Sequence, residues 1–151
     1  MKITPWYPAA LLLALCMSMS AAAQTPAPPP AEPAQGLWLA AQKDGVVEFK
    51  PCADEPSSMC GTVVWDKDAV PGKPGDCGLR IVKLRRKEDG VWRDGWVYDP
   101  REKKNYKGAL RIKGSVLALR AYIGTELLGQ TEEFTRVDAI PAGCPAAAAA
   151  K

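Results

Sequence analysis

The chain has 151 residues, with 20 Lys and Arg, 17 Asp and Glu, no His, and a formal net charge of +3. A balance this close to neutral does not favour nucleic acid or an anionic surface as the partner. The lack of His excludes the usual serine- and cysteine-protease dyads and most transition-metal sites.

The chain begins with the features of a secretory signal peptide. Lys2 precedes an apolar run over residues 9–19, and three alanines at 21–23 offer an Ala-x-Ala cleavage site before Gln24. The apolar run is too short to cross a bilayer as a helix, which takes about 20 residues. We therefore predict a signal peptide over residues 1–23 and a periplasmic or secreted protein. We expect no stable membrane insertion once the signal is removed.

Two further segments have the composition of connecting chain. Residues 24–35 are rich in Pro and Ala, which favours extended, solvated backbone and predicts a linker. Residues 139–151 contain Pro, Gly and a run of five alanines, too few to form an isolated helix, and are predicted to be a tail. We expect one β domain of about 100 residues between them, over residues 36–138.

Within the predicted domain, short runs of β-branched and aromatic residues alternate with turn signals. Asp-Gly pairs at 44–45 and 89–90 favour the positive φ of tight hairpins, and Asp-Pro at 99–100 favours a turn. The spacing is too short for βαβ crossovers. The pattern predicts an antiparallel β-sandwich or up-and-down barrel. The expected strands are residues 37–40, 46–50, 61–65, 79–86, 91–98, 105–112, 116–123 and 131–137.

The strand expected at 116–123 shows which of its faces is buried. Leu117, Leu119, Ala121 and Ile123 share one face, and Arg120 and Tyr122 lie on the other. This alternation is typical of a sheet that packs on a core with one face and meets water with the other.

Four cysteines remain after the signal peptide: Cys52, Cys60, Cys77 and Cys144. An even number in an exported chain favours disulfide bonds over free thiols. Three pairings are possible, and we favour Cys52–Cys60, which closes a short loop, with Cys77–Cys144, which closes a long one. Zinc is not favoured, because the chain has no His and no Cys-x-x-Cys.

The motifs along the domain, taken in chain order, are similar to those of one protein family. They are Gly-Leu-Trp at 36–38, Cys52 with Cys-Gly-Thr-Val-Val-Trp at 60–65, and Gly-Trp-Val-Tyr-Asp-Pro at 95–100 followed by Tyr106. Leu-Arg-Ala-Tyr-Ile-Gly at 119–124, Leu-Gly at 128–129 and Phe-Thr-Arg-Val at 134–137 complete the set. Over residues 36–137 the chain resembles the uncharacterised secreted bacterial family called domain of unknown function 2147.

The resemblance implies export and an all-β fold, a small antiparallel lipocalin-like up-and-down barrel of about eight strands, but no biochemical activity. It also implies a structural contact, because lipocalin-like barrels pair a Trp in the first strand with an Arg near the end of the last. Here those residues are Trp38, whose ring plugs one end, and Arg136, whose guanidinium packs on the ring. The chain departs from the family at 69–78, where a Gly- and Pro-rich stretch with Cys77 replaces an Asn-containing segment.

The sequence offers no catalytic residues that we can name. Glu132 and Glu133 are adjacent, so on a strand they point to opposite faces and cannot act as a pair. Asp66 and Asp68 are interpreted as solvated loop charges, since a calcium site needs more oxygen ligands. No nucleophile, phosphate-binding loop or cofactor motif is recognisable. We therefore do not expect an enzyme, a metal or a cofactor.

Binding is the favoured role, with two interpretations open. An eight-strand barrel has room either for its own side chains or for one small ligand. The first interpretation is a binding protein for a small apolar or amphipathic ligand. The second is a cell-envelope module that contacts another protein and has a filled barrel. Six aromatic residues are candidates to line a cavity or to fill the core: Trp65, Trp92, Trp96, Tyr98, Tyr106 and Tyr122.

Overall fold

The computed structural model describes residues 32–141 and residue 144. The predicted signal peptide, most of the predicted linker and most of the predicted tail lie outside these residues. In the part of the chain that is described, no helix is long and apolar enough to span a membrane. The strands are β1 Gly36–Ala40, β2 Gly45–Pro51, β3 Met59–Asp66, β4 Arg80–Leu84, β5 Arg86–Glu88, β6 Val91–Arg93, β7 Trp96–Asp99, β8 Lys104–Lys113, β9 Val116–Tyr122 and β10 Gln130–Val137. A short 3-10 helix, η1, covers Glu126–Leu128.

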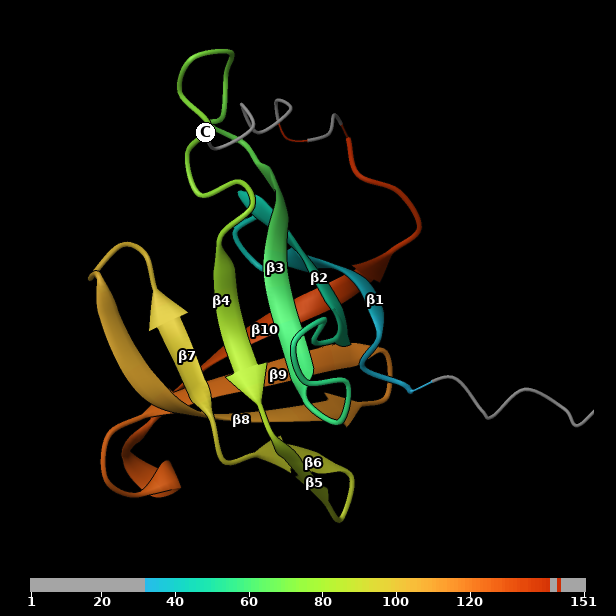
Figure 1. Ribbon diagram of the computed structural model, residues 1–151, viewed down its shortest axis with the longest axis vertical. Helices are drawn as coiled ribbons and strands as arrows, with labels where there is room; N and C mark the ends of the chain where they lie inside the picture. Colours follow the sequence, from blue (N-terminus) through green and yellow to red (C-terminus); the bar gives the residue numbers. More distant parts are fainter. Residues whose placement is uncertain (1–31, 142–143, 145–151) are drawn as a thin grey trace, which may run out of the picture. The chain divides into compact units, whose positions relative to one another are not determined.

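Eight of these strands form a closed antiparallel barrel (Figure 1). The ladder runs β7-β4-β3-β2-β1-β10-β9, and β8 closes the ring because it pairs with both β7 and β9. The first strand lies beside the last, with Trp38 opposite Arg136. The prediction of an all-β, lipocalin-like barrel of about eight strands is confirmed.

Two of the eight expected strands are broken in the structure. The segment expected at 79–86 divides into β4 and β5, and the segment expected at 91–98 divides into β6 and β7. Asp94 has a φ of 57°, and a Cβ on Gly95 would lie 1.8 Å from the carbonyl oxygen of Lys83. The chain therefore turns tightly against β4 at 94–95. Strands β5 and β6 form an additional hairpin, joined to the barrel by the pairing of β6 with β8.

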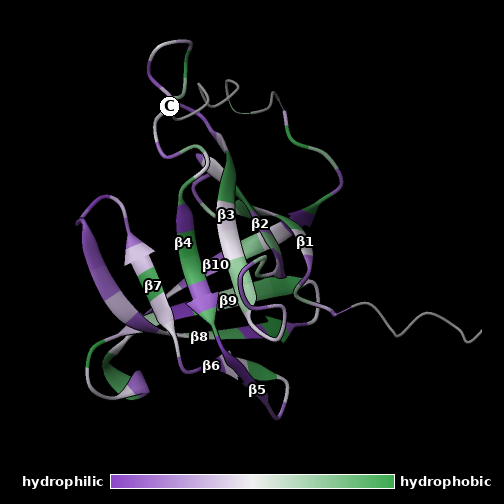
Figure 2. Ribbon diagram, viewed as in Figure 1, coloured by the Kyte–Doolittle hydropathy of each residue, from purple (hydrophilic) through white to green (hydrophobic). Residues whose placement is uncertain are grey.

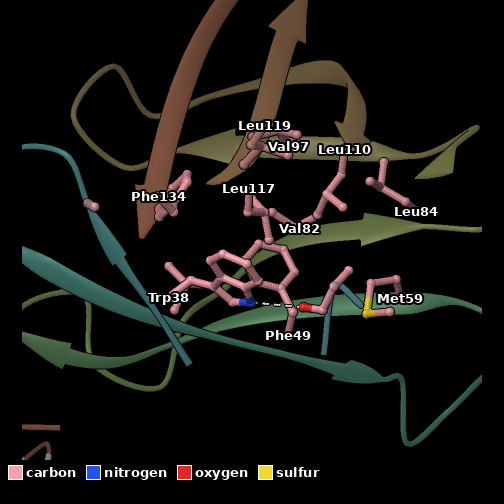
Figure 3. Packing of buried hydrophobic residues seen from close by; sticks show 13 residues of the cluster. Trp38, Phe49, Met59, Val82, Leu84, Val97, Leu110, Leu117, Leu119 and Phe134 are labelled. Atoms are coloured by element: carbon pink, nitrogen blue, oxygen red, sulfur yellow. Dashed lines mark hydrogen bonds between the residues drawn. The ribbon is translucent and has the colours of Figure 1, made fainter. Parts of the chain in front are cut away.

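A core of apolar side chains fills one half of the barrel (Figure 3). Its largest fully buried members are Trp38, Phe49, Met59, Leu84 and Leu110. The Trp38 indole donates a hydrogen bond from Nε1 to the carbonyl oxygen of Ala34, at 2.9 Å, so its polar edge is satisfied. This half of the barrel is therefore packed with apolar side chains around the indole.

The segment just before β1 covers this filled end. Ala34 is buried, and the Arg136 guanidinium donates hydrogen bonds to the carbonyl oxygens of Pro33 and Gln35. The guanidinium carbon lies 4.3 Å from the Trp38 ring centre. Residues 32–35, which sequence composition assigns to the linker, therefore pack against the barrel, and the contact implied by the family resemblance is present.

Two disulfide bonds hold connections of the barrel, in the pairing that we favoured. Cys52–Cys60 closes the β2–β3 connection. Cys77–Cys144 ties the β3–β4 connection to the segment after β10, where the Cys144 N–H also donates to the Val64 carbonyl oxygen. Bonds of this kind persist in oxidising compartments.

Candidate ligand-binding cavity

The other half of the barrel is hollow. The β1–β2, β3–β4, β7–β8 and β9–β10 connections meet at the same end, because antiparallel neighbours bring alternate connections together. Between them opens a cavity of about 1060 Å³. Its floor includes Val47, Val97, Leu119 and Phe134, which also belong to the buried core. The barrel is thus sealed at the Trp38 end and open at the end that carries these four connections.

Strands β9 and β10 place one carboxylate in the apolar wall of the cavity. Phe134 is buried, and Glu132, two residues earlier on β10, faces the same side. Glu132 lies opposite Leu119 of β9, whose side chain is buried as the alternation predicts. Glu132 is half-buried, whereas Glu133 is exposed. The strand therefore points the two adjacent glutamates to opposite faces, and Glu132 is the one on the inner face, although both border the cavity.

The position of Glu132 changes its acidity. Burial raises the pKa of its carboxyl above the usual value, an effect that Arg101 opposes and that Asp44 and Asp99 reinforce. Nothing in the described part of the chain donates a hydrogen bond to this carboxylate. A half-buried acid without a partner is a group that a bound ligand can satisfy.

The structure brings three of the six candidate aromatic residues to the cavity. Tyr98, Tyr106 and Tyr122 line it. Trp96 lines a second depression, of about 560 Å³, that it shares with Tyr98. Trp65 lines neither of them.

Trp92 lies at the filled half of the barrel. It packs against the core, and its Nε1 lies 3.4 Å from a carboxylate oxygen of Glu32 in the segment before β1. The break at 94–95 separates Trp92 from β7, so Trp92 and Trp96 are not neighbours on one continuous strand.

Acidic side chains surround the cavity, a feature that sequence analysis did not identify. Eight of the residues that line it carry carboxylates, and one, Arg101, is basic. The β7–β8 connection, which supplies Glu102 and follows Asp99, is strongly hydrophilic in Figure 2. The acids come from three connections and the strand ends beside them, and from Glu132 and Glu133 of β10, so no local motif reveals them.

The β3–β4 connection is organised by one of these acids. Asp66 accepts hydrogen bonds from the backbone N–H groups of Asp68, at 2.9 Å, and Asp76, at 2.8 Å. The pKa of Asp76 is raised, first by burial and then by the nearby Asp66 carboxylate. Asp66 therefore has a structural task in the loop beyond that of the solvated charge that we expected.

The single basic residue of the cavity is already engaged. The Arg101 guanidinium donates to Asp44 across the mouth, at 2.9 Å. The backbone N–H groups of Arg101 and Glu102 donate to the Asp99 side chain, which fixes the turn after β7. The Tyr106 hydroxyl donates to Glu102, and this bond raises the pKa of Tyr106.

Comparison with known proteins identifies the family. A family model described as an uncharacterized protein conserved in bacteria, DUF2147, matches residues 36–136. The chain belongs to this family. A search of curated proteins found no match to this DUF2147 chain. Among solved structures, it is similar to a protein from the human pathogen Helicobacter pylori that is described as belonging to the lipocalin family.

The similarity to the Helicobacter pylori protein concerns the fold. The TM-score is 0.55, the two chains are 15% identical, and the match covers 70% of this DUF2147 chain and 83% of the other. At this level of identity the comparison shows a shared lipocalin-like barrel, in agreement with the strand order described above.

The mouth of the cavity in this DUF2147 protein also carries apolar side chains. Ile123 and Leu128, on the β9–β10 connection, line the cavity although they are 71% and 82% exposed. The connection is anchored through Glu126, which pairs with Arg93 and Arg111. Burial alone would raise the pKa of Glu126, but these two arginines hold it below its usual value. The apolar surface therefore extends from the floor to the rim on one side.

Proposed function

We propose that this protein is an exported binding protein that holds a small amphipathic ligand in the open half of its barrel. The observation that carries the proposal is the cavity of about 1060 Å³, with an apolar floor and a polar rim, in a barrel that is otherwise filled. Ligand pockets are typically about 300–1,000 Å³, with apolar walls and a few polar groups that fix orientation.

The division of the barrel supports one route of entry. The filled end is blocked by the Trp38 ring and by Arg136 above it. A ligand therefore enters between the four connections at the open end. Its apolar part reaches Val47, Leu119 and Phe134, while its polar part remains near the rim.

Export is supported by two features of the chain. The first residues have the pattern of a secretory signal peptide, and the barrel holds two disulfide bonds. A binding protein outside the cytoplasm meets ligands that arrive from the surroundings or are released from the envelope.

Filling the cavity tests this proposal. Ala121 lines the cavity, and Thr135 is exposed on the outer face of β10. We expect Ala121→Trp to weaken binding of the neutral fluorescent probe N-phenyl-1-naphthylamine by about tenfold or more, because the indole occupies the space of the ligand. Thr135→Trp, which adds a similar side chain outside, should bind like the parent.

Circular dichroism and thermal unfolding check that both variants fold. If Ala121→Trp does not fold, Ala121→Leu gives a smaller obstruction and should reduce affinity less. The proposal fails if the parent does not bind the probe, or if the folded cavity variants bind it as well as Thr135→Trp does.

A further inference from the structure

The distribution of charge around the cavity is very uneven. The chain has 17 acidic and 20 basic residues, yet eight of the acids and one of the bases line the cavity. A protein with a net positive charge thus has a binding cavity of strongly negative character. Charge of one sign around a low-dielectric cavity concentrates ligands of the opposite sign and speeds their entry.

Glu132 makes this charge relevant to a bound ligand as well as to an approaching one. Its carboxylate lies in the cavity wall, on the same face as Phe134 and opposite Leu119. An ionised carboxylate in such surroundings is unfavourable unless a charge or a donor pairs with it. Arg101, the basic residue of the cavity, is bonded to Asp44.

The arrangement of the acids favours an organic cation over a metal ion. A calcium ion takes six to eight oxygen ligands that converge on one point. Among residues 32–141 and 144, the group that converges to within 4.8 Å is Cys52, Asp54 and Cys60, which lies in and beside the β2–β3 connection. The cavity acids are more widely spaced, and the floor beneath them is apolar.

We infer that the ligand is an amphipathic cation, with an ammonium or similar head beside Glu132 and an apolar part on the floor of the barrel. This inference rests on the proposed function, since it specifies the chemical class of ligand for the same cavity. The acids of the rim attract the head, and Glu132 pairs with it inside the wall. The exposed Ile123 and Leu128 extend the apolar surface available to a longer ligand.

Three ligands with the same ten-carbon chain separate the effect of charge from that of apolar contact. Decyltrimethylammonium, decanol and decanoate are used below their micelle concentrations to displace N-phenyl-1-naphthylamine at neutral pH. We expect the ammonium to displace the probe at a concentration about tenfold or more below that of decanoate, with decanol between them. The difference should shrink between about 0.01 M and about 0.15 M salt, where the Debye length falls from about 30 Å to about 8 Å.

Two variants with the same change in charge locate the effect. Glu132→Gln should reduce the preference for the ammonium over decanoate by about tenfold and leave decanol binding nearly unchanged. Glu48→Gln is the control, because Glu48 lies on β2 between the buried Val47 and Phe49 and faces outward, next to Lys50. It should keep the parent preference.

The outcomes distinguish the inference from the proposed function. If decanoate or decanol displaces the probe as well as the ammonium does, the cavity binds ligands but the inference is wrong. Equal effects of Glu132→Gln and Glu48→Gln would overturn the assignment of the cationic head to Glu132. Failure of the parent protein to bind the probe at all would overturn the proposed function itself.

Discussion

Trp38 and Arg136 form a contact between the first and the last strand of the barrel. The guanidinium carbon lies 4.3 Å from the ring centre of a fully buried indole, and the guanidinium donates hydrogen bonds to the carbonyl oxygens of Pro33 and Gln35. This pair was predictable only through the family resemblance, which implies that a Trp in the first strand meets an Arg near the end of the last. Its effect on stability has two parts, since the Trp also fills the core and the Arg also binds the preceding segment.

A double-mutant cycle separates these parts. We expect Trp38→Ala to cost about 3–5 kcal/mol and Arg136→Ala to cost less, in urea unfolding. The double variant should be more stable than the sum of the two losses implies, by about 0.5–2 kcal/mol, because the stacked contact is lost only once. Strict additivity would show that the two side chains do not stabilise each other.

Glu132 illustrates a residue whose role the sequence leaves open. The pair at 132–133 predicts one glutamate on each face of a strand, but does not say which of them faces inward. That depends on the position of Phe134 in the core and on the pairing of β10 with β9. Whether the candidate tyrosines line the cavity depends in the same way on where their strands begin and end.

The raised pKa of Glu132 predicts that the carboxylate destabilises the protein at neutral pH. A folded-state pKa above the ordinary value of 4.5 means that the folded protein holds this proton more tightly than the unfolded chain does. The cost is therefore absent below pH 4.5 and grows as the pH rises through the folded-state pKa. Glu132→Gln should raise the stability at neutral pH by up to about 1 kcal/mol, because water still reaches the half-buried group.

Unfolding midpoints across the pH range measure this effect, with Glu48→Gln as the control. The advantage of Glu132→Gln over the parent should disappear in acid. A variant that is less stable than the parent at neutral pH would show that Glu132 already has a favourable partner inside the cavity.

At the level of secondary structure, the number of barrel strands was predictable and two of their boundaries were not. The pattern of apolar runs indicates eight segments, and the structure forms an eight-stranded ring. The Asp94-Gly95 dipeptide, a turn signal inside an apolar run, was included in a strand although it breaks one. At the first hairpin the positive φ falls on Lys43 and not on Gly45, so the Asp-Gly pair there does not form the turn that we expected.

Two glycines in and beside the strands are required by close packing of different kinds. A Cβ at Gly108 of β8 would lie 2.6 Å from Cγ2 of Val97 and 2.9 Å from Cδ2 of Leu84, both side-chain atoms. At Gly95 the obstacle is the backbone carbonyl of Lys83. A side chain can be shortened by mutation, whereas a strand backbone cannot.

This difference predicts which glycine substitution can be rescued. Gly108→Ala should cost about 1–3 kcal/mol through overpacking, and Gly108→Ala with Val97→Ala should cost less than the two single changes added together. Gly95→Ala should be more harmful, and Val97→Ala should not relieve it. Urea unfolding of six proteins provides the comparison: the parent, the three single variants, and the two double variants that combine Val97→Ala with each glycine change. If the effect of Val97→Ala simply adds to that of Gly108→Ala, as it should to that of Gly95→Ala, then Val97 is not the obstacle to a side chain at position 108.

For the molecule as a whole, the cavity was the least predictable feature. The composition gives a small net charge, which hides the acids gathered at one end because bases elsewhere compensate for them. The filling of one half of the barrel was also open, since the same aromatic residues suit a core or a cavity. By contrast, the cysteine number and the expected export predicted two disulfide bonds, and the structure has the favoured one of the three possible pairings.

The two disulfide bonds should differ in their effect on stability. Cys77 and Cys144 are 67 residues apart, and Cys52 and Cys60 are eight apart. In the chain-entropy model, removal of the long-range bond by paired Ser substitutions costs about 4 kcal/mol and removal of the short-range bond about 2.5 kcal/mol. Urea unfolding of the two double variants tests this order, and a larger loss from the short-range pair would contradict it.

Closure of the barrel also affects how readily this protein aggregates at high concentration. An edge strand has unpaired backbone N–H and C=O groups that can pair with strands of other molecules and lead to aggregation. A closed barrel has no edge strands. In the part of the chain that the structure describes, β5 lies at the end of the strand order and is an edge strand. Its three residues, Arg86, Lys87 and Glu88, are all charged and exposed. A second chain that tried to extend the sheet there would have to desolvate these charges, so the protein should remain dispersed at high concentration.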